Sequence, residues 1–574
     1  MQSTSRLGFP APLLLCLLAS LIFSACAPPQ PGGSGGERGA IQPSAPKRVS
    51  AVVRGDVPTL VPDAPGPVPG LAEMVELVNV GLTTWGPGGG LLPRLAEEVP
   101  STENGLWKVF PDGRMETTWK LRRNALWHDG TPVTAADFLF RAQVYQDQRM
   151  PFSGGSSAAT LLRFIDAMEA PDPNTLVVKW KSIYLQANQG FDFPFPKHLL
   201  EPIYAQGDAE RFLALPYWTT DFVGVGAFKV KSFVVGSGAT LEAFDGYFLG
   251  RPRIDTIDVK FIVDPNTIGA NILAGEVDVT FGGRLPLDWA QEIKDRSPNA
   301  TFGTSTANPM VVYQNLQNPV PAAILQPDFR RALAHGLDRR EMVDSLVAGL
   351  TTVAHATVLN PGRTEEFREH DPKAAKYEFD QRRATQLIDG LGYRKGQDHV
   401  YRDANGQPLV LEIRTTQGDV QQERSTFAMS ASWEQIGLET TPVIVPSARR
   451  GDDQYRNTFP GFDVRRNPHR PDTLKQYFHS ANAPTPERSY RGSQYIRYVN
   501  PEWDALIDLH DRTVPDRERN EVLGRIVQFM TDQVLVIGLF YDVEVTVWTT
   551  RLQNVHTRGD QMRESWNAHE WDVR

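Results

Sequence analysis

The chain has 574 residues, 41% hydrophobic and 22% charged, which is the composition of a folded protein rather than a disordered one. A formal net charge of −9 without a long basic run excludes a typical sequence-independent nucleic-acid binder. The two cysteines, Cys16 and Cys26, are too few for a disulfide framework or for motif-built zinc and iron–sulfur sites, so we expect no metal and no cofactor. The length predicts several domains or lobes.

The N-terminus has the pattern of a targeting segment. Arg6 precedes the apolar stretch Ala11–Phe23. As a helix this stretch would be about 20 Å long, too short for the ~30 Å core of a membrane. A charged start, a short apolar core and small residues after it are typical of a secretory signal peptide, so we expect residues 1–25 to be one.

The residues around Cys26 predict a lipid anchor. Ser24–Cys26 resembles a bacterial lipobox, whose cysteine is acylated after cleavage, although Phe23 stands where that motif usually has Leu. Ala25–Ala27 also fits an ordinary signal peptidase site, which would release a free protein. Residues 26–47 are rich in Gly and Pro and predict a flexible tether spanning about 25 Å. We expect a lipid-anchored protein at the outer face of the cytoplasmic membrane or in the periplasm.

The first part of the body alternates strand and helix patterns. Val49–Val53 is typical of a buried strand, and Ile257–Val263 alternates apolar and polar residues like a half-buried strand. Asp264 followed by Pro predicts the start of a helix that runs to Ala274. Glu276–Phe281 is the next expected strand, which completes a β-α-β unit with parallel strands.

The second part continues the alternation. Its expected elements are a long amphipathic helical region at Asp328–Leu350, a helix at Asp380–Asp389, a strand at Leu409–Thr415, helices at Pro501–Arg512 and Val514–Gln533, and an apolar β region at Val534–Thr549. The class predicted for the whole body is α/β.

Screens for catalytic motifs find no constellation. Gly32–Gly36 matches the G-x-S-x-G nucleophile elbow, but it lies in the tether and lacks the strand–turn–helix context. His128 and Asp129 could suggest a metal site or an acid/base pair, but the sequence that follows Asp129 is typical of a turn. Thr134–Asp137 is a capping box that starts the following helix. We therefore expect that the protein is not an enzyme. A secreted hydrolase or a ligand sensor on the same fold remains the alternative.

An ordered series of motifs carries a resemblance to a known family. The series comprises Leu92–Pro100, Pro111–Arg114, Trp119–Phe138, the glycine-rich Val223–Phe233, Leu241–Pro252, Ala274–Val279, Asp328–Arg339 and Asn500–Leu506. Together these segments resemble the extracytoplasmic solute-binding proteins of ABC transporters, family 5, which includes oligopeptide, dipeptide and nickel binders. The resemblance spans about residues 50 to 550.

The resemblance implies a two-lobed periplasmic-binding-protein-like fold that closes like a hinged trap. It implies lobe I at residues 48–302, with an extra inserted subdomain at about 85–215, lobe II at 303–535, and a return to lobe I at 536–574. Hinge strands are expected near Phe302–Gln314 and Leu535–Glu544. The implied function is the substrate-binding component of an ABC importer, a monomer that captures a peptide or similar organic solute and delivers it to permease and ATPase subunits.

The ligand is left open among a peptide, another organic solute such as an oligosaccharide or acidic metabolite, and a metal chelate. Peptide binders of the family commonly carry a Trp–Ala–Asp–Tyr stretch in the second lobe, but Phe462–Thr473 stands there and contains Arg465, Arg466 and Arg470. Arginine suits carboxylate or phosphate, so we expect Arg465 or Arg466 to face the cleft and meet an anionic or carbonyl-rich group. Asp472 is the candidate replacement for the acid.

Four aromatic residues complete the candidate binding set. They are Trp85, Tyr217, Trp218 and Tyr313. Aromatic side chains with polar neighbours are what a cleft needs to enclose a flexible organic ligand. Each of the four fits a buried core position equally well.

Overall fold

The computed structural model describes residues 45–61, 68–150, 152, 157–189, 191, 193–281, 285, 287–558 and 564–574. The expected signal peptide, Cys26 and most of the expected tether lie outside the described residues. Residues from Pro46 to Arg574 form one compact unit. Among the described helices, none combines the length and the apolar character needed to cross a membrane.

The largest sheet has the strand order β16-β15-β17-β12-β18-β11-β1-β10-β9-β8. The strand β1 (Arg48–Val53) lies between β10 (Thr256–Phe261) and β11 (Val279–Phe281) and is parallel to both. The helix α6 (Pro265–Leu273) connects β10 to β11, and the carboxylate of Asp264 caps it by accepting the N–H of Thr267 at 3.0 Å. The expected parallel arrangement is confirmed, but β1 separates the two strands of the expected unit.

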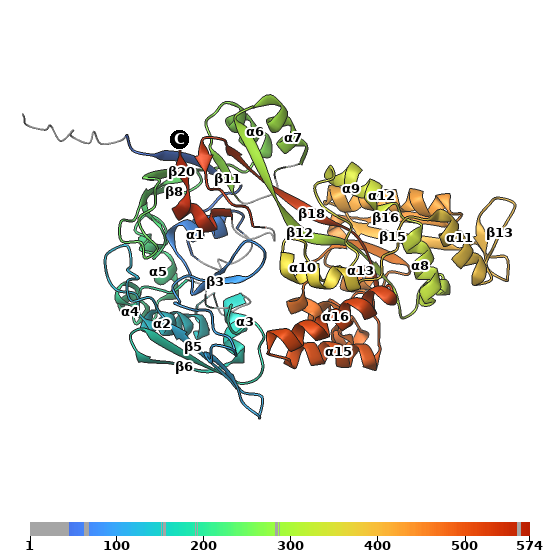
Figure 1. Cartoon of the computed structure of the whole chain (residues 1–574), viewed down its shortest axis with the longest axis horizontal. Helices are drawn as coiled ribbons and strands as arrows, with labels where there is room; N and C mark the ends of the chain where they lie inside the picture. Colours follow the sequence, from blue (N-terminus) through green and yellow to red (C-terminus); the bar gives the residue numbers. More distant parts are fainter. Residues whose placement is uncertain are drawn as a thin grey trace, which may run out of the picture. The chain divides into compact units, whose positions relative to one another are not determined.

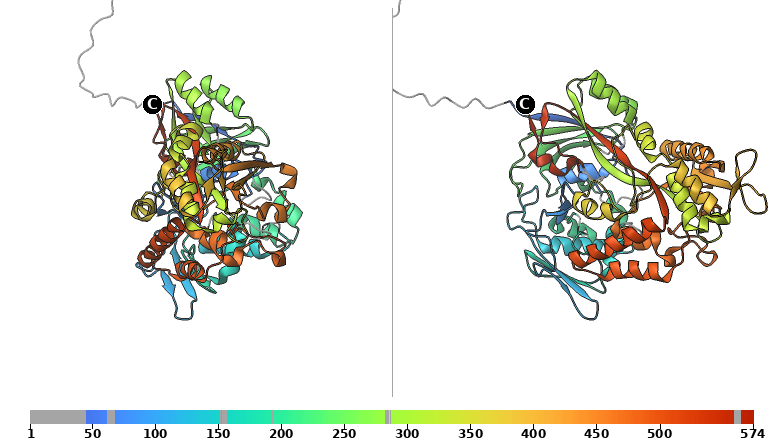
Figure 2. Two further views of the ribbon diagram at one scale, coloured as in Figure 1. Left: turned by 90° about the vertical axis from the view of Figure 1, so that its right-hand side faces the viewer. Right: turned by 45° about the vertical axis from the view of Figure 1, so that its right-hand side comes forward.

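Two long antiparallel strands join the two halves of this sheet. They are β12 (Ala300–Gln314) and β18 (Val536–Thr549), which run side by side in Figures 1 and 2. β18 pairs with β11 through Trp548, and β12 pairs with β17 (Phe462–Arg466). These strands lie where hinge strands are expected.

The remaining elements fall on either side of these strands, and we call the groups the first and second lobe. The first lobe runs from β1 to α7 and includes the C-terminal elements β19, η9 and β20, where η marks a 3-10 helix. The second lobe runs from η3 to α16. First-lobe elements are α1 (Leu71–Val78), β2 (Thr83–Trp85), β3 (Leu91–Pro93), β4 (Trp107–Val109), β5 (Met115–Lys120), α2 (Ala135–Gln146), α3 (Ser157–Phe164), β6 (Ile165–Asp172), β7 (Thr175–Trp180), α4 (Lys197–Tyr204), α5 (Ala209–Leu213), η2 (Pro216–Trp218), β8 (Phe228–Val234), β9 (Gly238–Ala243), α7 (Leu287–Arg296), β19 (Leu552–Gln553), η9 (Glu564–Glu570) and β20 (Asp572–Val573).

Second-lobe elements are η3 (Ala322–Leu325), α8 (Pro327–His335), α9 (Arg339–Val347), α10 (Thr364–His370), η4 (Asp371–Lys373), α11 (Gln381–Gly390), β13 (Arg394–Lys395), β14 (Tyr401–Arg402), β15 (Val410–Thr416), α12 (Val420–Gln435), β16 (Glu439–Val445), η5 (Ser447–Arg449), α13 (Asp453–Asn457), η6 (Pro471–Thr473), α14 (Leu474–Phe478), η7 (Ser480–Asn482), η8 (Pro486–Arg488), α15 (Pro501–Arg512) and α16 (Asp516–Asp532). The expected helix at Pro501–Arg512 and the strand at Leu409–Thr415 are thus confirmed, the latter within one residue.

The expected helical region Asp328–Leu350 is in fact two helices, α8 and α9. The chain leaves the first helix at Gly336, and the second begins after Asp338, whose carboxylate accepts the N–H of Glu341 at 3.0 Å. A side chain that caps a new helix competes with continuation of the preceding one, which accounts for the break.

Separate hydrophobic cores support the two lobes. The first lobe contains a large aromatic core that includes Trp119, Trp127 and Trp180, and a smaller core under α6 and α7. The second lobe contains one core around α8 and α12 and another around α15 and α16. Each lobe therefore buries apolar surface of its own on both sides of the connecting strands.

Candidate functional site

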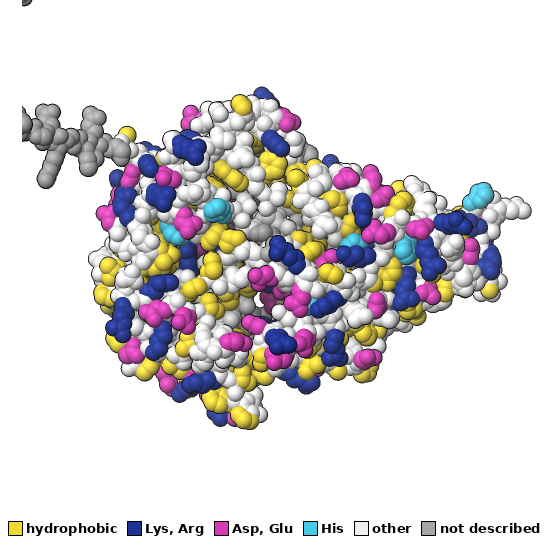
Figure 3. Space-filling view, viewed as in Figure 1, with side chains coloured by type: hydrophobic (Ala, Val, Ile, Leu, Met, Phe, Trp, Pro, Cys, Tyr) yellow, Lys and Arg dark blue, Asp and Glu magenta, His cyan; other side chains and the backbone are white. Residues whose placement is uncertain are grey.

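A cavity of about 490 Å³ lies between the two lobes. First-lobe segments 85–101 and 185–189 form one wall, and second-lobe segments 363–369, 471–472 and 510–523 form the other. This volume falls in the range of small-molecule sites, roughly 300–1,000 Å³. Figure 3 shows a hollow beside α10 with Asp and Glu side chains gathered around it.

The first-lobe wall is built on a glycine-rich hairpin. The strands β2 and β3 are antiparallel, and the N–H of Gly86 donates to the carbonyl of Gly90 at 2.8 Å to close the turn. Gly89 has a φ of 89°, and a Cβ built on it would lie 2.6 Å from Cγ of Arg363. The missing side chain therefore lets the second lobe approach this turn closely.

A cation–π pair connects the two walls of the cavity. The guanidinium carbon of Arg363 lies 4.6 Å from the centre of the Trp85 ring. The two residues belong to different lobes and both line the cavity. The pair therefore ties the hairpin to the segment that leads into α10.

The second-lobe wall is acidic. Its described carboxylates are Glu365, Glu366, Glu369, Asp472 and Asp516. Burial raises the pKa of Glu366 to about 7, with a further rise from Asp472 and an opposing effect of Arg363. The Oε1 atom of Glu366 is buried and, within the described part of the chain, has no hydrogen-bond partner.

Of the candidate binding residues, Trp85 and Asp472 line this cavity. Asp472 lies in η6, and its Oδ1 accepts from Nε of Arg470 at 3.1 Å. The structure thus brings together two candidates that are far apart in the sequence. The other candidate residues do not line the cavity.

Tyr217 and Trp218 lie in the first-lobe core instead. The Tyr217 hydroxyl donates to the carbonyl of Val223 at 3.0 Å, and Nε1 of Trp218 donates to the carbonyl of Phe212 at 2.7 Å. Because each polar atom already has a backbone partner and each ring is buried, these two residues serve packing.

Tyr313 is also a core residue, on β12. Its hydroxyl lies 2.5 Å from Nε2 of His469 and accepts from the side-chain amide of Asn467 at 2.7 Å. Nδ1 of His469 lies 3.1 Å from the hydroxyl of Thr357. Burial lowers the pKa of His469 to about 3, so the histidine is neutral in this network.

Arg465 is buried within the second lobe. Its guanidinium lies 2.5 Å from Oδ2 of Asp463, donates to the carbonyl of Arg456 at 3.0 Å and to Oδ1 of Asn457 at 3.2 Å, and lies 3.8 Å from the centre of the Tyr495 ring. Its charge is neutralised inside the lobe, so the structure does not support the expected contact with an anionic ligand.

Arg466 is likewise paired within the protein. Its Nε lies 2.8 Å from a carboxylate oxygen of Asp542 on β18, and its Nη1 lies 3.3 Å from Asp419, the residue that caps α12. Arg466 therefore connects β17 and α12 to a connecting strand. Like Arg465, it does not line the cavity.

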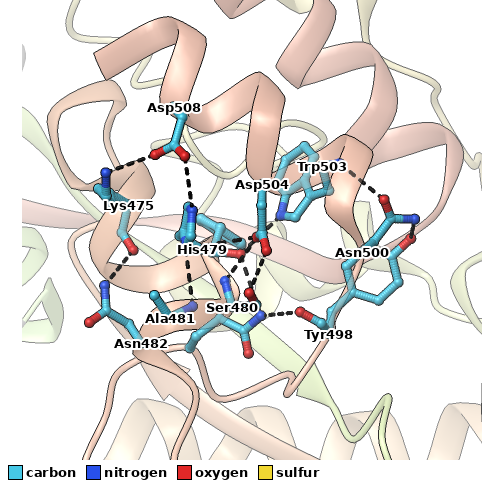
Figure 4. Close-up of polar contacts among 12 residues, drawn as sticks. Lys475, His479, Ser480, Ala481, Asn482, Tyr498, Asn500, Trp503, Asp504 and Asp508 are labelled. Atoms are coloured by element: carbon cyan, nitrogen blue, oxygen red, sulfur yellow. Dashed lines mark hydrogen bonds and ion pairs between the residues drawn. The ribbon is translucent and has the colours of Figure 1, made fainter. Parts of the chain in front are cut away.

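One group of nucleophile, base and acid side chains in the second lobe is structural. Figure 4 shows His479 beside both Asp504 and Asp508, and Ser480 beside Asp504. The Ser480 hydroxyl donates to Asp504, and Nδ1 of His479 accepts the N–H of Ala481 at 3.0 Å. A serine nucleophile needs a hydrogen bond to its base, and Ser480 gives its proton to a carboxylate instead, so this group does not form a catalytic triad.

The described residues contain no cluster of three or more His, Cys, Asp or Glu side chains arranged to hold a metal ion.

His128 is a structural residue, as its turn position in the sequence predicts. Its Nε2 lies 3.1 Å from the carbonyl of Gly226, and its Nδ1 accepts the N–H of Gly224 at 3.1 Å. The capping box at Thr134 is confirmed, since its N–H donates to the Asp137 carboxylate at 2.8 Å.

Comparison with known proteins agrees with the two-lobed architecture. Residues 90–485 match the model of the bacterial extracellular solute-binding proteins, family 5 middle region. The chain belongs to this family. The family-5 proteins are binding proteins that work outside the cytoplasm.

Three similar proteins illustrate the range of the family. A putative ABC transporter peptide-binding protein of Brucella ovis is 26% identical over 356 residues, which cover 61% of each chain. The oligopeptide-binding protein AppA of Bacillus subtilis is 24% identical over 73% of this chain and 74% of its own. The crystal structure of NikZ from Campylobacter jejuni, in complex with Ni(L-His), has a TM-score of 0.65 at 19% identity and covers 92% of this chain and all of its own.

Sequence reasoning missed Arg363 and Glu366 as site residues. The dense acidic pattern of Glu365, Glu366 and Glu369 was a visible signal, since residues three and four positions apart share a face of a helix. Nothing in the sequence shows that this helix borders a cavity.

Proposed function

We propose that this chain is the solute-binding component of an ABC importer. It captures a peptide or similar organic solute outside the cytoplasmic membrane and delivers it to the permease, which ATPase subunits drive. The protein acts as a monomer, without a cofactor and without chemistry on the solute. The names of the similar proteins, which include peptide-binding and oligopeptide-binding proteins, support this proposal.

The single observation that carries the proposal is the position of the cavity. Its walls come from both lobes, and the lobes are joined by the strands β12 and β18. A solute that contacts both walls stabilises the closed arrangement, so affinity and closure form one equilibrium. Arg363 and Trp85, one from each wall, already contact each other across the cavity.

We also propose the division of the chain that this mechanism requires. Lobe I comprises residues 48–302 with a subdomain inserted at about 85–215, lobe II comprises 303–535, and residues 536–574 return to lobe I. The hinge lies in the paired segments of β12 and β18. Residues 1–25 are the signal peptide, and Cys26 carries the lipid that holds the tether of residues 26–47 at the membrane.

Release and rebinding of the natural solute test the proposal. The purified full chain is denatured, the released solutes are identified by mass spectrometry, and each is titrated back in a calorimeter. We expect one organic solute to bind saturably and to reduce the radius of gyration in X-ray scattering. Trp85→Ala should weaken binding at least tenfold, whereas Phe427→Ala, at an exposed position outside the cavity wall, should not. Conversion of the solute to a product would favour the hydrolase instead.

A further inference from the structure

The cavity between the lobes has an unbalanced charge. Its described wall carries the carboxylates Glu365, Glu366, Glu369, Asp472 and Asp516 against the guanidinium groups Arg363 and Arg519. Wall charges of one sign attract a ligand of the opposite sign, and a low-dielectric surrounding strengthens that attraction.

Three of the five carboxylates already have cationic partners. Asp516 pairs with Arg519, Asp472 pairs with Arg470 at 3.1 Å, and Glu369 lies 3.6 Å from Lys373. Within the described residues, no ion-pair partner lies within 4 Å of the two other carboxylates, Glu365 and Glu366.

Glu366 differs from Glu365 because it is half-buried and one of its carboxylate oxygens is buried. Glu365 is exposed and water can solvate it, but the Oε1 atom of Glu366 is buried without a hydrogen-bond partner among the described groups. An unpaired buried carboxylate is costly, and native proteins rarely keep one without a role. The nearby cation, Arg363, lies over the Trp85 ring.

We propose that the solute bound in this cavity carries an ammonium or guanidinium group and that Glu366 is the carboxylate that pairs with it. This inference rests on the proposed function and specifies its ligand class. An anionic solute would have to enter beside a carboxylate that has no ion-pair partner among the described residues, whereas a cation would supply one. The two arginines that suggested an anionic ligand, Arg465 and Arg466, are already paired with carboxylates of the protein.

A cationic ligand also predicts the pH dependence of binding. The charged and titratable groups that line the cavity around Glu366 are Arg363, Glu365, Glu369, Asp472, His510, Asp516 and Arg519. Burial raises the pKa of Glu366 to about 7, so a rise from pH 6 to pH 8 ionises it. The ionised fraction grows from about a tenth to about nine tenths, and affinity for a cation should grow about ninefold.

The test uses the full chain and five defined probes: trilysine, N-acetyl-trialanine amide, N-acetyl-triglutamate, spermidine and glutarate. The acetyl group removes the N-terminal ammonium of the neutral and anionic peptides. Binding to each is measured by calorimetry at pH 6 and pH 8. We expect trilysine or spermidine to bind at least tenfold more tightly than the neutral and anionic probes, and to bind more tightly at pH 8. Glu366→Gln should remove both the preference and the pH dependence. This change removes an unpaired buried charge, so thermal unfolding should not occur at a lower temperature.

Glu292→Gln is the control, because Glu292 lies outside the cavity wall and is an exposed carboxylate that pairs with Arg296 at 2.7 Å. It should change cation affinity less than threefold. An equal loss in both variants would overturn the assignment to Glu366. Equal or tighter binding of N-acetyl-trialanine amide, N-acetyl-triglutamate or glutarate would overturn the charge inference and leave the proposed function standing. Absence of binding by all five probes would overturn the cationic-ligand inference, whereas the proposed function is tested separately by release and rebinding of the natural solute.

Discussion

The buried ion pair between Asp463 and Arg465 makes a strong prediction about stability. Their side chains are 7% and 8% exposed, and they lie two residues apart on β17. Replacing Asp463 with Asn keeps the shape of the side chain but leaves the guanidinium buried without its counter-charge. Removing one partner of a buried pair costs about 3–5 kcal/mol, and the remaining contacts of Arg465 with Arg456 and Asn457 place the expected loss near ~3 kcal/mol.

This loss should be visible in thermal unfolding. For a lobe of this size, each kcal/mol corresponds to roughly 2–4 °C in Tm, so Asp463→Asn should lower the Tm of the second lobe by about 6–12 °C. Solute affinity should stay within threefold of the parent, because neither Asp463 nor Arg465 lines the cavity. The assay is differential scanning calorimetry with parallel binding titrations.

Glu521→Gln is the matched control for this experiment. Its partner in α16 is Arg517 at 3.7 Å, and their side chains are 68% and 90% exposed. Exposed pairs contribute about 0–1 kcal/mol, so this Tm should barely move. If Asp463→Asn unfolds like the parent while solute affinity falls tenfold, the pair belongs to the binding surface and the reasoning is refuted.

Further predictions concern packing, anchoring and acid stability. Gly226→Ala should destabilise the first lobe by about 1–3 kcal/mol in chemical unfolding, because the new Cβ would lie 2.3 Å from the carbonyl carbon of Val78. Gly390→Ala is the control and should leave stability unchanged, because a Cβ there meets no atom within 4 Å. Cys26→Ser should move the protein from the membrane fraction to the soluble fraction. When the pH drops from 6.5 to 5, the free energy of unfolding should fall by about 2 kcal/mol for a buried neutral histidine such as His469. The reason is that burial lowers the pKa of His469 in the folded state, so the unfolded chain binds the proton first. His469→Gln should therefore reduce the dependence of stability on pH.

Each of these has a contrary result. Equal unfolding midpoints for the two glycine variants would show that the backbone near Val78 yields easily. Unchanged membrane partition without Cys26 would exclude lipid anchoring at that residue. An unaltered pH slope in the His469 variant would mean that its proton equilibrium does not contribute to stability.

Local patterns in the sequence predicted much of the fold. The alternation in β10, the cap at Asp264 and the two C-terminal helices follow from interactions between residues a few positions apart, which a sequence displays directly. The position of β1 between β10 and β11 does not follow from local patterns, because its partners lie about 200 residues away.

The candidate site was harder to predict, for physical reasons visible in two cases. Trp85 and Trp218 are the same residue type with polar neighbours, but one lines the cavity and the other fills a core, and tertiary packing decides between them. The ion pair of Asp463 and Arg465 could have been predicted from the sequence. Residues two positions apart in a strand lie on the same face, so their opposite charges are close enough to pair. Arg363 and Trp85 meet only after both lobes have folded.

The most direct test of the central claim is a crystal structure of the full chain with its identified solute bound. We predict electron density for the solute between the hairpin of β2 and β3 and the helices α10 and α16, with contacts to both Trp85 and Glu366. Density confined to one lobe, or located away from this cavity, would contradict the account.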